Sequence, residues 1–291
     1  DGREGLTATG SSGASADEAL KPFVELFPIS DGSASTAARV EEHIVSDVIR
    51  MSKGRLESGD VSRLLGLEAV TVADLIPGEY EGGFKLWEGS DDLVKCLCEE
   101  WRLQVSPCEA EFAPPPEVSG KRVLELGCGH GLPGVFAALA GASEVGFADF
   151  NAEVLTHLTA PNLLANLARL PPGRDAPSAR YFAGDWLRTA EALHAEGSPP
   201  YDIILTSETV YSHDSTRRLL QALELLLPEG ATSVKVYIAA KSYYFGVGGG
   251  AQQFQKLALQ SGKFTCESVY AVEDGASNKR EVMLLQRQPQ S

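Results

Sequence analysis

A regular alternation of short apolar segments and amphipathic segments, from about residue 120 to the C-terminus, most constrains the fold of this chain. Apolar runs of strand length occur at residues 122–126, 144–148, 179–183, 201–206 and 233–240. Helical patterns separate most of these runs. Strands that alternate with helices build βαβ units with right-handed crossovers, so the pattern predicts a mostly parallel sheet.

Two further predicted strands, residues 264–272 and 282–286, follow without a helix between them. Such neighbours pair as an antiparallel hairpin, because a parallel connection needs a long crossover. The sequence therefore predicts an α/β fold of Rossmann-like type. Its sheet has seven mostly parallel strands with a C-terminal antiparallel hairpin, and helices cover both faces.

The N-terminal quarter has a different character. Residues 1–20 are rich in Gly, Ser, Ala and acidic side chains, and we expect them to be disordered. Residues 21–73 are an N-terminal extension, in which residues 37–52 have apolar side chains at helical spacing and predict an amphipathic helix. The main domain is expected at residues 74–291. The chain begins with Asp1 rather than Met, so we read it as part of a longer protein.

Composition excludes several classes of function. The hydrophobic fraction of 43% is that of a globular protein, and the net charge of −15 argues against direct nucleic-acid binding. The five cysteines include no C-x-x-C pair and no zinc-like spacing, so we expect reduced thiols and no metal. No apolar run reaches the ~18 residues of a membrane span.

A glycine-rich loop follows the first strand of the main domain, in the segment from Glu125 through Gly127 and Gly129 to Gly131. Ligands of open α/β sheets bind at the carboxyl ends of the strands, where glycines allow close backbone approach. A dinucleotide fingerprint would need a further glycine where Leu132 stands. The pattern resembles motif I of class I methyltransferases instead. The alternative is a tight strand–helix turn that binds no ligand.

Carboxylates end the next two strands. Asp149 lies about 20 residues beyond the glycines and can accept from both ribose hydroxyls of an adenosine. Its alternative role is a helix cap, for which Asn151 is the better candidate, although we also place Asn151 at the site. Asp185 can accept from an adenine amino group, and Trp186 offers a flat face for stacking. Together these residues predict an adenosyl site.

The fourth strand runs into a polar segment that contains Ser207, Glu208 and Tyr211. We place Ser207 at the cofactor, and Glu208 and Tyr211 at the reacting atoms. A buried structural tyrosine is the alternative for Tyr211. The segment lacks the Asn-Pro-Pro-Tyr signature, which argues against an enzyme that methylates DNA amino groups or glutamine.

Several segments resemble one family, the eukaryotic histidine protein methyltransferases related to yeast histidine protein methyltransferase 1, within the seven-β-strand class I methyltransferases. The resemblance covers about residues 72–287. Its motifs are Asp74-Leu75-Ile76-Pro77, Tyr80-Glu81-Gly82-Gly83, Leu86-Trp87-Glu88, Thr159-Ala160-Pro161-Asn162, residues 205–211 and Tyr244-Phe245-Gly246-Val247-Gly248-Gly249-Gly250. Two positions depart from the family: Glu125 stands where many members have Asp, a conservative change, and Gly89 stands where relatives have Cys.

The resemblance implies methyl transfer from S-adenosylmethionine to a histidine imidazole of a protein, with S-adenosylhomocysteine as product. It places Trp87 at the cofactor or in a lid, and Tyr244, Phe245, Gly246 and Gly248 along the substrate. The family's target is a basic protein of the large ribosomal subunit, which an acidic enzyme would attract. We expect a monomer without nucleic-acid or membrane partners, located in the cytoplasm or in the nucleus as well.

Two other functions stay open. One is a protein-lysine N-methyltransferase of the same fold, whose acceptor amine must lose a proton before it reacts. The other is a cofactor-binding partner in ribosome assembly that has no catalytic activity.

Overall fold

The computed structural model describes residues 20–26, 39–66, 75–76, 78–244, 246, 248–273 and 278–289. The segment expected to be disordered, residues 1–20, lies outside these residues except for Leu20, and the substrate role expected for Phe245 also lies outside them. Nothing in the described ranges forms a helix long and apolar enough to cross a membrane.

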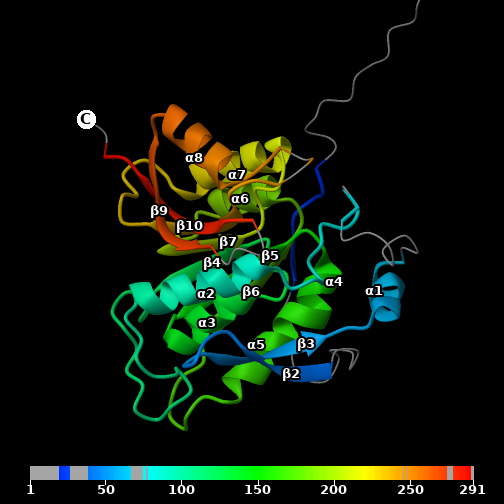
Figure 1. Cartoon of the computed structure of the whole chain (residues 1–291), viewed down its shortest axis with the longest axis vertical. Coiled ribbons are helices and arrows are strands. Elements are labelled where there is room, and N and C mark those ends of the chain that lie inside the picture. Colours follow the sequence, from blue (N-terminus) through cyan, green and yellow to red (C-terminus); the bar gives the residue numbers. More distant parts are fainter. Residues whose placement is uncertain are drawn as a thin grey trace, which may run out of the picture.

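An eight-stranded sheet forms the centre of the molecule, with the strand order β1-β6-β5-β4-β7-β8-β10-β9 (Figure 1). Five central strands are parallel, and β10 runs antiparallel between β8 and β9. All seven predicted strands are present, and the closing hairpin is confirmed. The eighth strand, β1, was not predicted. The strands are β1 (Val24–Leu26), β4 (Arg122–Leu126), β5 (Glu144–Asp149), β6 (Ser178–Ala183), β7 (Ile203–Ser207), β8 (Lys235–Lys241), β9 (Phe264–Val272) and β10 (Arg280–Arg287).

Helices cover both faces of this sheet, as predicted (Figure 1). One layer contains α2 (Glu88–Glu100), α3 (Leu132–Ala140), α4 (Ala152–Val154), a π-helical turn (Leu155–Thr159) and α5 (Ala160–Leu167). The other contains α6 (Trp186–Ala195), α7 (His213–Leu226) and α8 (Ala251–Gln260). The sequence patterns had not indicated α6.

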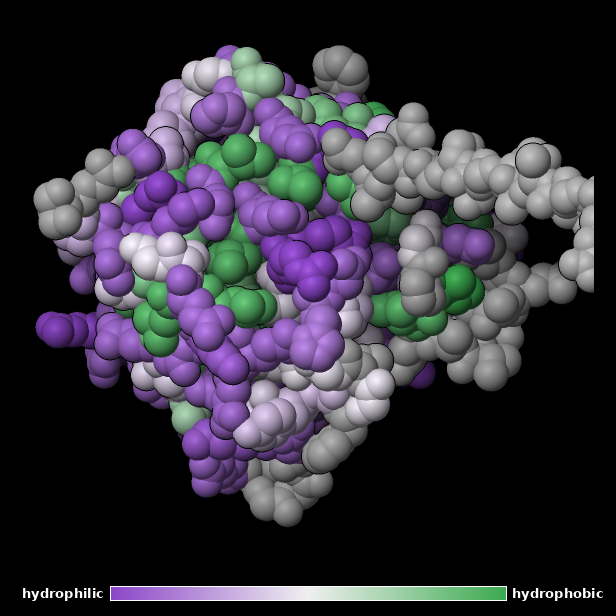
Figure 2. Space-filling model, turned by 90° about the horizontal axis from the view of Figure 1, so that it is seen from above, coloured by the Kyte–Doolittle hydropathy of each residue, from purple (hydrophilic) through white to green (hydrophobic). Residues whose placement is uncertain are grey.

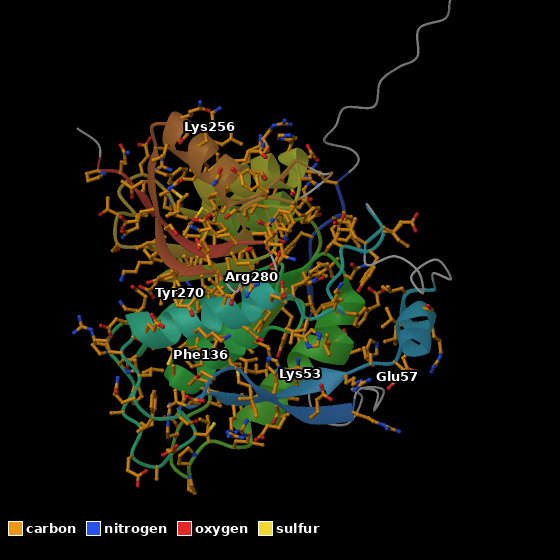
Figure 3. The ribbon with its side chains drawn as sticks, in the orientation of Figure 1. Lys53, Glu57, Phe136, Lys256, Tyr270 and Arg280 are labelled. Carbon is orange, nitrogen blue, oxygen red and sulfur yellow. The ribbon has the colours of Figure 1, made fainter. Side chains whose placement is uncertain are left out.

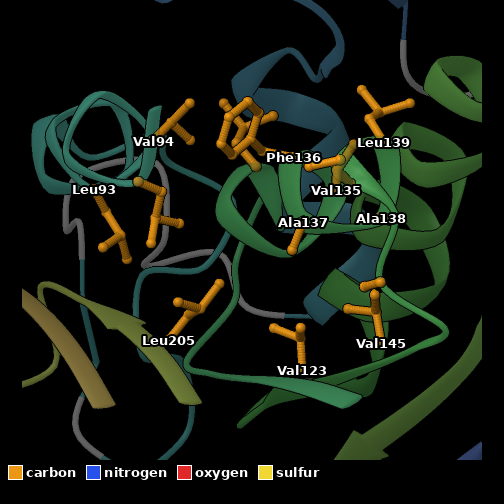
Figure 4. Close-up of a cluster of buried hydrophobic side chains, with 14 of the residues drawn as sticks. Leu93, Val94, Val123, Val135, Phe136, Ala137, Ala138, Leu139, Val145 and Leu205 are labelled. Atoms are coloured by element: carbon orange, nitrogen blue, oxygen red, sulfur yellow. The ribbon is translucent and has the colours of Figure 1, made fainter. Parts of the chain in front are cut away.

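The strands are apolar on both faces because a separate core packs on each. On one face, Val123 of β4 and Leu205 of β7 lie beneath Leu93 of α2 and Phe136 of α3 (Figure 4). Leu124, the neighbour of Val123, points to the opposite core formed with α6, α7 and α8. Each fully buried side chain of this size contributes ~1.5–3 kcal/mol. Two-sided burial therefore explains why the strands appear as continuous apolar runs.

A two-stranded hairpin replaces the amphipathic helix predicted for residues 37–52, so that prediction was wrong. The hairpin consists of β2 (Arg39–Ile44) and β3 (Arg50–Arg55), and the short helix α1 (Ser58–Leu65) follows. Two side chains of α5 bind the backbone of β3: Asn166 Oδ1 accepts from Ser52 N at 2.8 Å and Asn162 Oδ1 from Gly54 N at 2.6 Å. These contacts depend on the tertiary fold and outweigh the local helical spacing.

A buried ion pair ties the C-terminal hairpin to α2. The Arg280 Nε atom donates to Asp92 Oδ2 at 2.6 Å, and both side chains are buried. Figure 3 shows Arg280 next to α2.

On the face of the molecule seen in Figure 2, hydrophilic residues predominate and hydrophobic ones form only small patches.

Candidate active site

The glycine loop at the end of β4 borders an inner cavity of about 50 Å³. Gly127 and Gly129 line this cavity with left-handed φ angles of 64° and 50°. A Cβ on Gly127 would lie 2.6 Å from Thr209 Cγ2, and one on Gly129 would lie 3.0 Å from Gly83 O. Side chains are therefore excluded at these two positions by both backbone conformation and space.

An outer cavity of about 530 Å³ adjoins the inner one. The two cavities share the lining residues Glu81, Trp87, Phe150, Glu208 and Tyr211. Both lie at the carboxyl ends of the parallel strands, where ligands of open α/β sheets bind. The segment before α2 closes this edge, on the right in Figure 1.

Asp149 lies at the end of β5 and lines the inner cavity. Its Oδ2 accepts from Gly129 N at 2.9 Å and its Oδ1 from Asn151 N at 3.0 Å. Burial raises the pKa of this carboxyl to about 6, although both backbone donors lower it. Each carboxylate oxygen retains a second lone pair, so the residue can also accept from two ligand hydroxyls.

Three predicted cofactor residues lie behind the cavity wall instead of lining it. Glu125 is buried under the first turn of α3, where one oxygen accepts from Gly134 N at 2.8 Å and burial raises the pKa to about 8. Gly131 is the N-cap of α3. The Asn151 side chain does not cap a helix but donates to Glu79 O at 2.8 Å. In this structure these three residues support the cavity wall from behind.

Asp185 and Trp186 lie at the start of α6 and line different cavities. The indole of Trp186 lines the inner cavity, close to the Gly127 position. Asp185 lines the outer one, where its carboxylate caps α6 through Leu187 N at 2.9 Å and binds Arg218 Nη1 at 2.8 Å. A ligand donor at Asp185 would therefore share the carboxylate with an existing ion pair.

The end of β7 brings the two proposed catalytic residues to the boundary between the cavities. Glu208 has a left-handed φ of 57°, which is rare for a residue with a side chain and is typical of constrained functional sites. The hydroxyl of Tyr244 donates to Glu208 Oε2, and that of Tyr211 donates to Glu81. Burial raises the pKa of Glu208, while the Tyr244 hydroxyl and Lys241 oppose that shift. Among the described residues, Glu208 Oε1 has no side-chain partner, and this oxygen is buried against the backbone of Gly89.

Residues around α2 complete the wall. The Trp87 indole donates to Gly82 O at 3.1 Å and lines both cavities, as a residue at the candidate site would. Ser207 also lines the inner cavity, and its hydroxyl lies 3.0 Å from that of Ser90. A Cβ on Gly89 would lie 2.9 Å from Glu208 Oε1, so the glycine at this position leaves room for the carboxylate.

The last two glycines of the run after β8 pack against the chain itself. A Cβ on Gly249 would lie 2.3 Å from Val210 O, and Gly250 N donates to that same oxygen at 2.8 Å. Gly249 and Gly250 therefore allow the loop to pack on residues 210–212, and the substrate role expected of Gly246 and Gly248 stays a prediction. Tyr244 reaches the outer cavity, whereas Gly246 and Gly248 line a separate shallow depression beside α8.

Sequence reasoning missed Phe150 and Glu81. Phe150 directly follows Asp149, and its position after a strand that ends in a carboxylate predicted to bind the ligand was the available signal. Glu81 stood within a recognised motif, but only the fold shows that it accepts from Tyr211. The Thr159–Asn162 motif also gains a role: Thr159 Oγ1 donates to Gly129 O at 2.6 Å, which fixes the glycine loop.

Comparison with known proteins agrees with this geometry. A family model described as lysine methyltransferase matches residues 78–245. A structure described as a candidate SAM-dependent methyltransferase from Streptococcus mutans covers 88% of this chain at 16% identity, with a TM-score of 0.51. The fold is therefore that of a class I methyltransferase.

Curated relatives carry a more specific name, histidine protein methyltransferase 1 or its homolog. Identity is 43% over 210 residues with the protein of Dictyostelium discoideum, which covers 72% of this chain and 59% of the relative. It is 35% over 221 residues with that of Mus musculus (70% and 56%), and 28% over 232 residues with that of Saccharomyces cerevisiae (64% and 58%). The chain thus spans a little over half the length of these relatives.

The chain belongs to the methyltransferase family that the model defines. Its predicted resemblance to histidine protein methyltransferases is confirmed by the curated relatives. The predicted cofactor, S-adenosylmethionine, is confirmed at the level of fold and family.

Proposed function

We propose that this chain transfers a methyl group from S-adenosylmethionine to an imidazole nitrogen of a histidine in a protein. The proposal is supported by the names of the relatives and, in the structure, by one observation. A constrained, buried carboxylate, Glu208, lies where the two cavities meet and has one oxygen without a side-chain partner.

The lining residues fit the cofactor. Asp149 offers acceptors for the ribose hydroxyls, Trp186 offers a stacking face, and the cradle at Gly127 and Gly129 has no room for a Cβ. Bound S-adenosylmethionine supplies a methyl group on a sulfonium, which is a good leaving group. The protein therefore needs no nucleophile of its own, and its task is mainly to orient the acceptor.

The acceptor must be a neutral imidazole, because a protonated nitrogen has no lone pair. A free histidine has a pKa of about 6.5, so the neutral form dominates at pH 7.5. We assign to Glu208 the task of accepting the N–H of the ring nitrogen that does not react, which selects the tautomer. After methylation the ring is cationic, and the Glu208 carboxylate can take the N–H proton. Tyr211 is less suited, because its hydroxyl already donates to Glu81.

The protein that carries this histidine is expected to be basic. Glu81, Glu208 and Asp214 line the outer cavity, and the whole chain has a net charge of −15. A basic segment would be attracted to such a surface. The resemblance suggests a protein of the large ribosomal subunit as substrate, a monomeric enzyme, and a location in the cytoplasm or in the nucleus as well.

A lysine acceptor is the alternative, and the description of the matching family model favours it. A lysine amine has a pKa of about 10.4 and must be deprotonated, so the rate would keep rising well above pH 8. A histidine acceptor predicts a rate that levels off once the imidazole is neutral, near pH 7.5.

The test is incubation of the protein with labelled S-adenosylmethionine and ribosomal proteins that have not been methylated, followed by mapping of the label to single residues. Label on a histidine of a large-subunit protein is expected. Label on lysine would replace the proposal by the alternative. No transfer despite cofactor binding would favour a non-catalytic assembly partner.

A further inference from the structure

The N-terminal strand reaches the candidate site because of its direction. β1 pairs antiparallel with β6, with Val24 opposite Ala183 and Leu26 opposite Tyr181. An antiparallel edge strand begins at the edge where its parallel neighbours end. Residues 20–23 therefore lie at the carboxyl edge of the sheet (Figure 1), where Leu20 and Lys21 line the outer cavity.

Strong contacts fix β1 in this place. The Arg180 guanidinium donates to both carboxylate oxygens of Glu25, at 2.8 and 3.0 Å. Two parallel bonds of this kind give geometric specificity as well as energy. The ring of Phe23 also stacks on that of Phe182, with a centroid distance of 5.9 Å. The strand is thus anchored and can position the residues before it.

The backbone before β1 packs directly on the loop that opens α6. Lys21 O accepts from Asp185 N at 3.2 Å. Gly184 has a φ of +130°, and a Cβ there would lie 2.4 Å from Pro22 O. Any residue with a Cβ at position 184 would collide with the backbone of Pro22, so this packing requires glycine there.

The Lys21 side chain extends this contact to the cavity wall. Its ammonium lies 4.5 Å from the centroid of the Phe150 ring, in the range of a cation–π contact. Leu20 and Lys21 line the outer cavity, and Phe150 lines both cavities next to Asp149. Arg218 lines the outer cavity too, but its guanidinium is paired with Asp185 and Asp214.

We propose that residues 20–26 form part of the cofactor site and that Lys21 is a cofactor-binding residue that contacts the adenosine portion. Asp149 and Asp185 only accept hydrogen bonds when ionised, so they suit the hydroxyl and amino donors of adenosine. The adenine ring nitrogens only accept, and a lysine ammonium is a donor-only group. Lys21 supplies the complementary chemistry from a segment outside the region matched by the family model.

The test is calorimetric titration of the full chain with S-adenosylhomocysteine. Lys21→Met keeps the apolar stem and removes the charge, and we expect its Kd to rise about tenfold, the change that ~1.4 kcal/mol produces. Lys21→Arg should stay within about threefold of the parent chain. The matched control is Lys263→Met, since Lys263 pairs with Glu224 and precedes β9 at the opposite edge of the sheet. An unchanged Kd for Lys21→Met would overturn the proposal.

Hydrogen exchange of the unmodified chain gives a second, independent measurement. S-adenosylhomocysteine should slow amide exchange in residues 20–26, and exchange there that does not respond to the ligand would count against the proposal. The proposal rests on the cofactor of the proposed function but not on its acceptor. Binding of S-adenosylhomocysteine needs no acceptor, so this test can still be carried out if histidine methylation is not found. Conversely, an unchanged Kd for Lys21→Met would not count against histidine methylation.

Discussion

Replacement of Glu208 by glutamine should lower turnover with little effect on cofactor affinity. Glutamine preserves the shape of the side chain and faces the same left-handed φ of 57°, so the fold should persist. The substitution removes the charge that would accept the imidazole N–H in a site where the side chain is almost fully buried. A hydrogen bond to a charged group contributes ~1.5–3 kcal/mol, which corresponds to a loss of about 10- to 150-fold in kcat.

The assay is the initial rate of methyl transfer to a histidine peptide at saturating cofactor, together with the Kd for S-adenosylhomocysteine. The matched control is Glu267→Gln, because Glu267 is an exposed glutamate of β9. A Glu208→Gln enzyme with a kcat within twofold of the parent would refute the assignment of Glu208. A large rise in the Kd for S-adenosylhomocysteine instead would make Glu208 a cofactor ligand.

Three further changes test other parts of the site and fold. Asp149→Asn should raise the Kd for S-adenosylhomocysteine at least about tenfold. In the parent chain, protonation of Asp149 removes an acceptor, so affinity should fall as the pH drops through about 6. Titration of both chains at pH 5 and pH 8 measures the two effects. Tyr211→Phe should cost about fivefold in kcat by releasing Glu81, and parental turnover would exclude Tyr211 from the mechanism. Arg280→Ala removes the partner of the buried Asp92 carboxylate, which should lower the free energy of unfolding by ~3–5 kcal/mol. The Tm in a thermal melt should therefore fall by about 10 °C. An unchanged Tm would mean that the pair contributes nothing to stability.

Most of the sheet could be predicted because its signals are local. Runs such as residues 203–205 are apolar on both faces, and the glycines after β4 meet both a steric and a conformational requirement. Asp149 and Trp186 were predicted at the site for a related reason: strand ends converge at one edge of a parallel sheet, so sequence position fixes spatial position.

The parts that could not be predicted depend on partners far away in the sequence. Residues 39–55 form a hairpin because Asn162 and Asn166 satisfy the backbone of β3. Glu125 is a similar case at the site, because its hydrogen-bond partner is the backbone amide of Gly134 in α3. The strand β1 has only three residues, and it forms on the exposed edge of β6. Neither the strand nor its position beside the cavity can be inferred from those three residues alone.

The chemical identity of the methylated residue tests the central claim most directly. After incubation with labelled S-adenosylmethionine and large-subunit ribosomal proteins, complete acid hydrolysis releases the modified amino acid for chromatography against standards. The account predicts label in N-methylhistidine, and less of it in a parallel reaction with Asp149→Asn at the same subsaturating concentration of cofactor. Label in methyllysine would contradict the account and assign this active site to an amine acceptor.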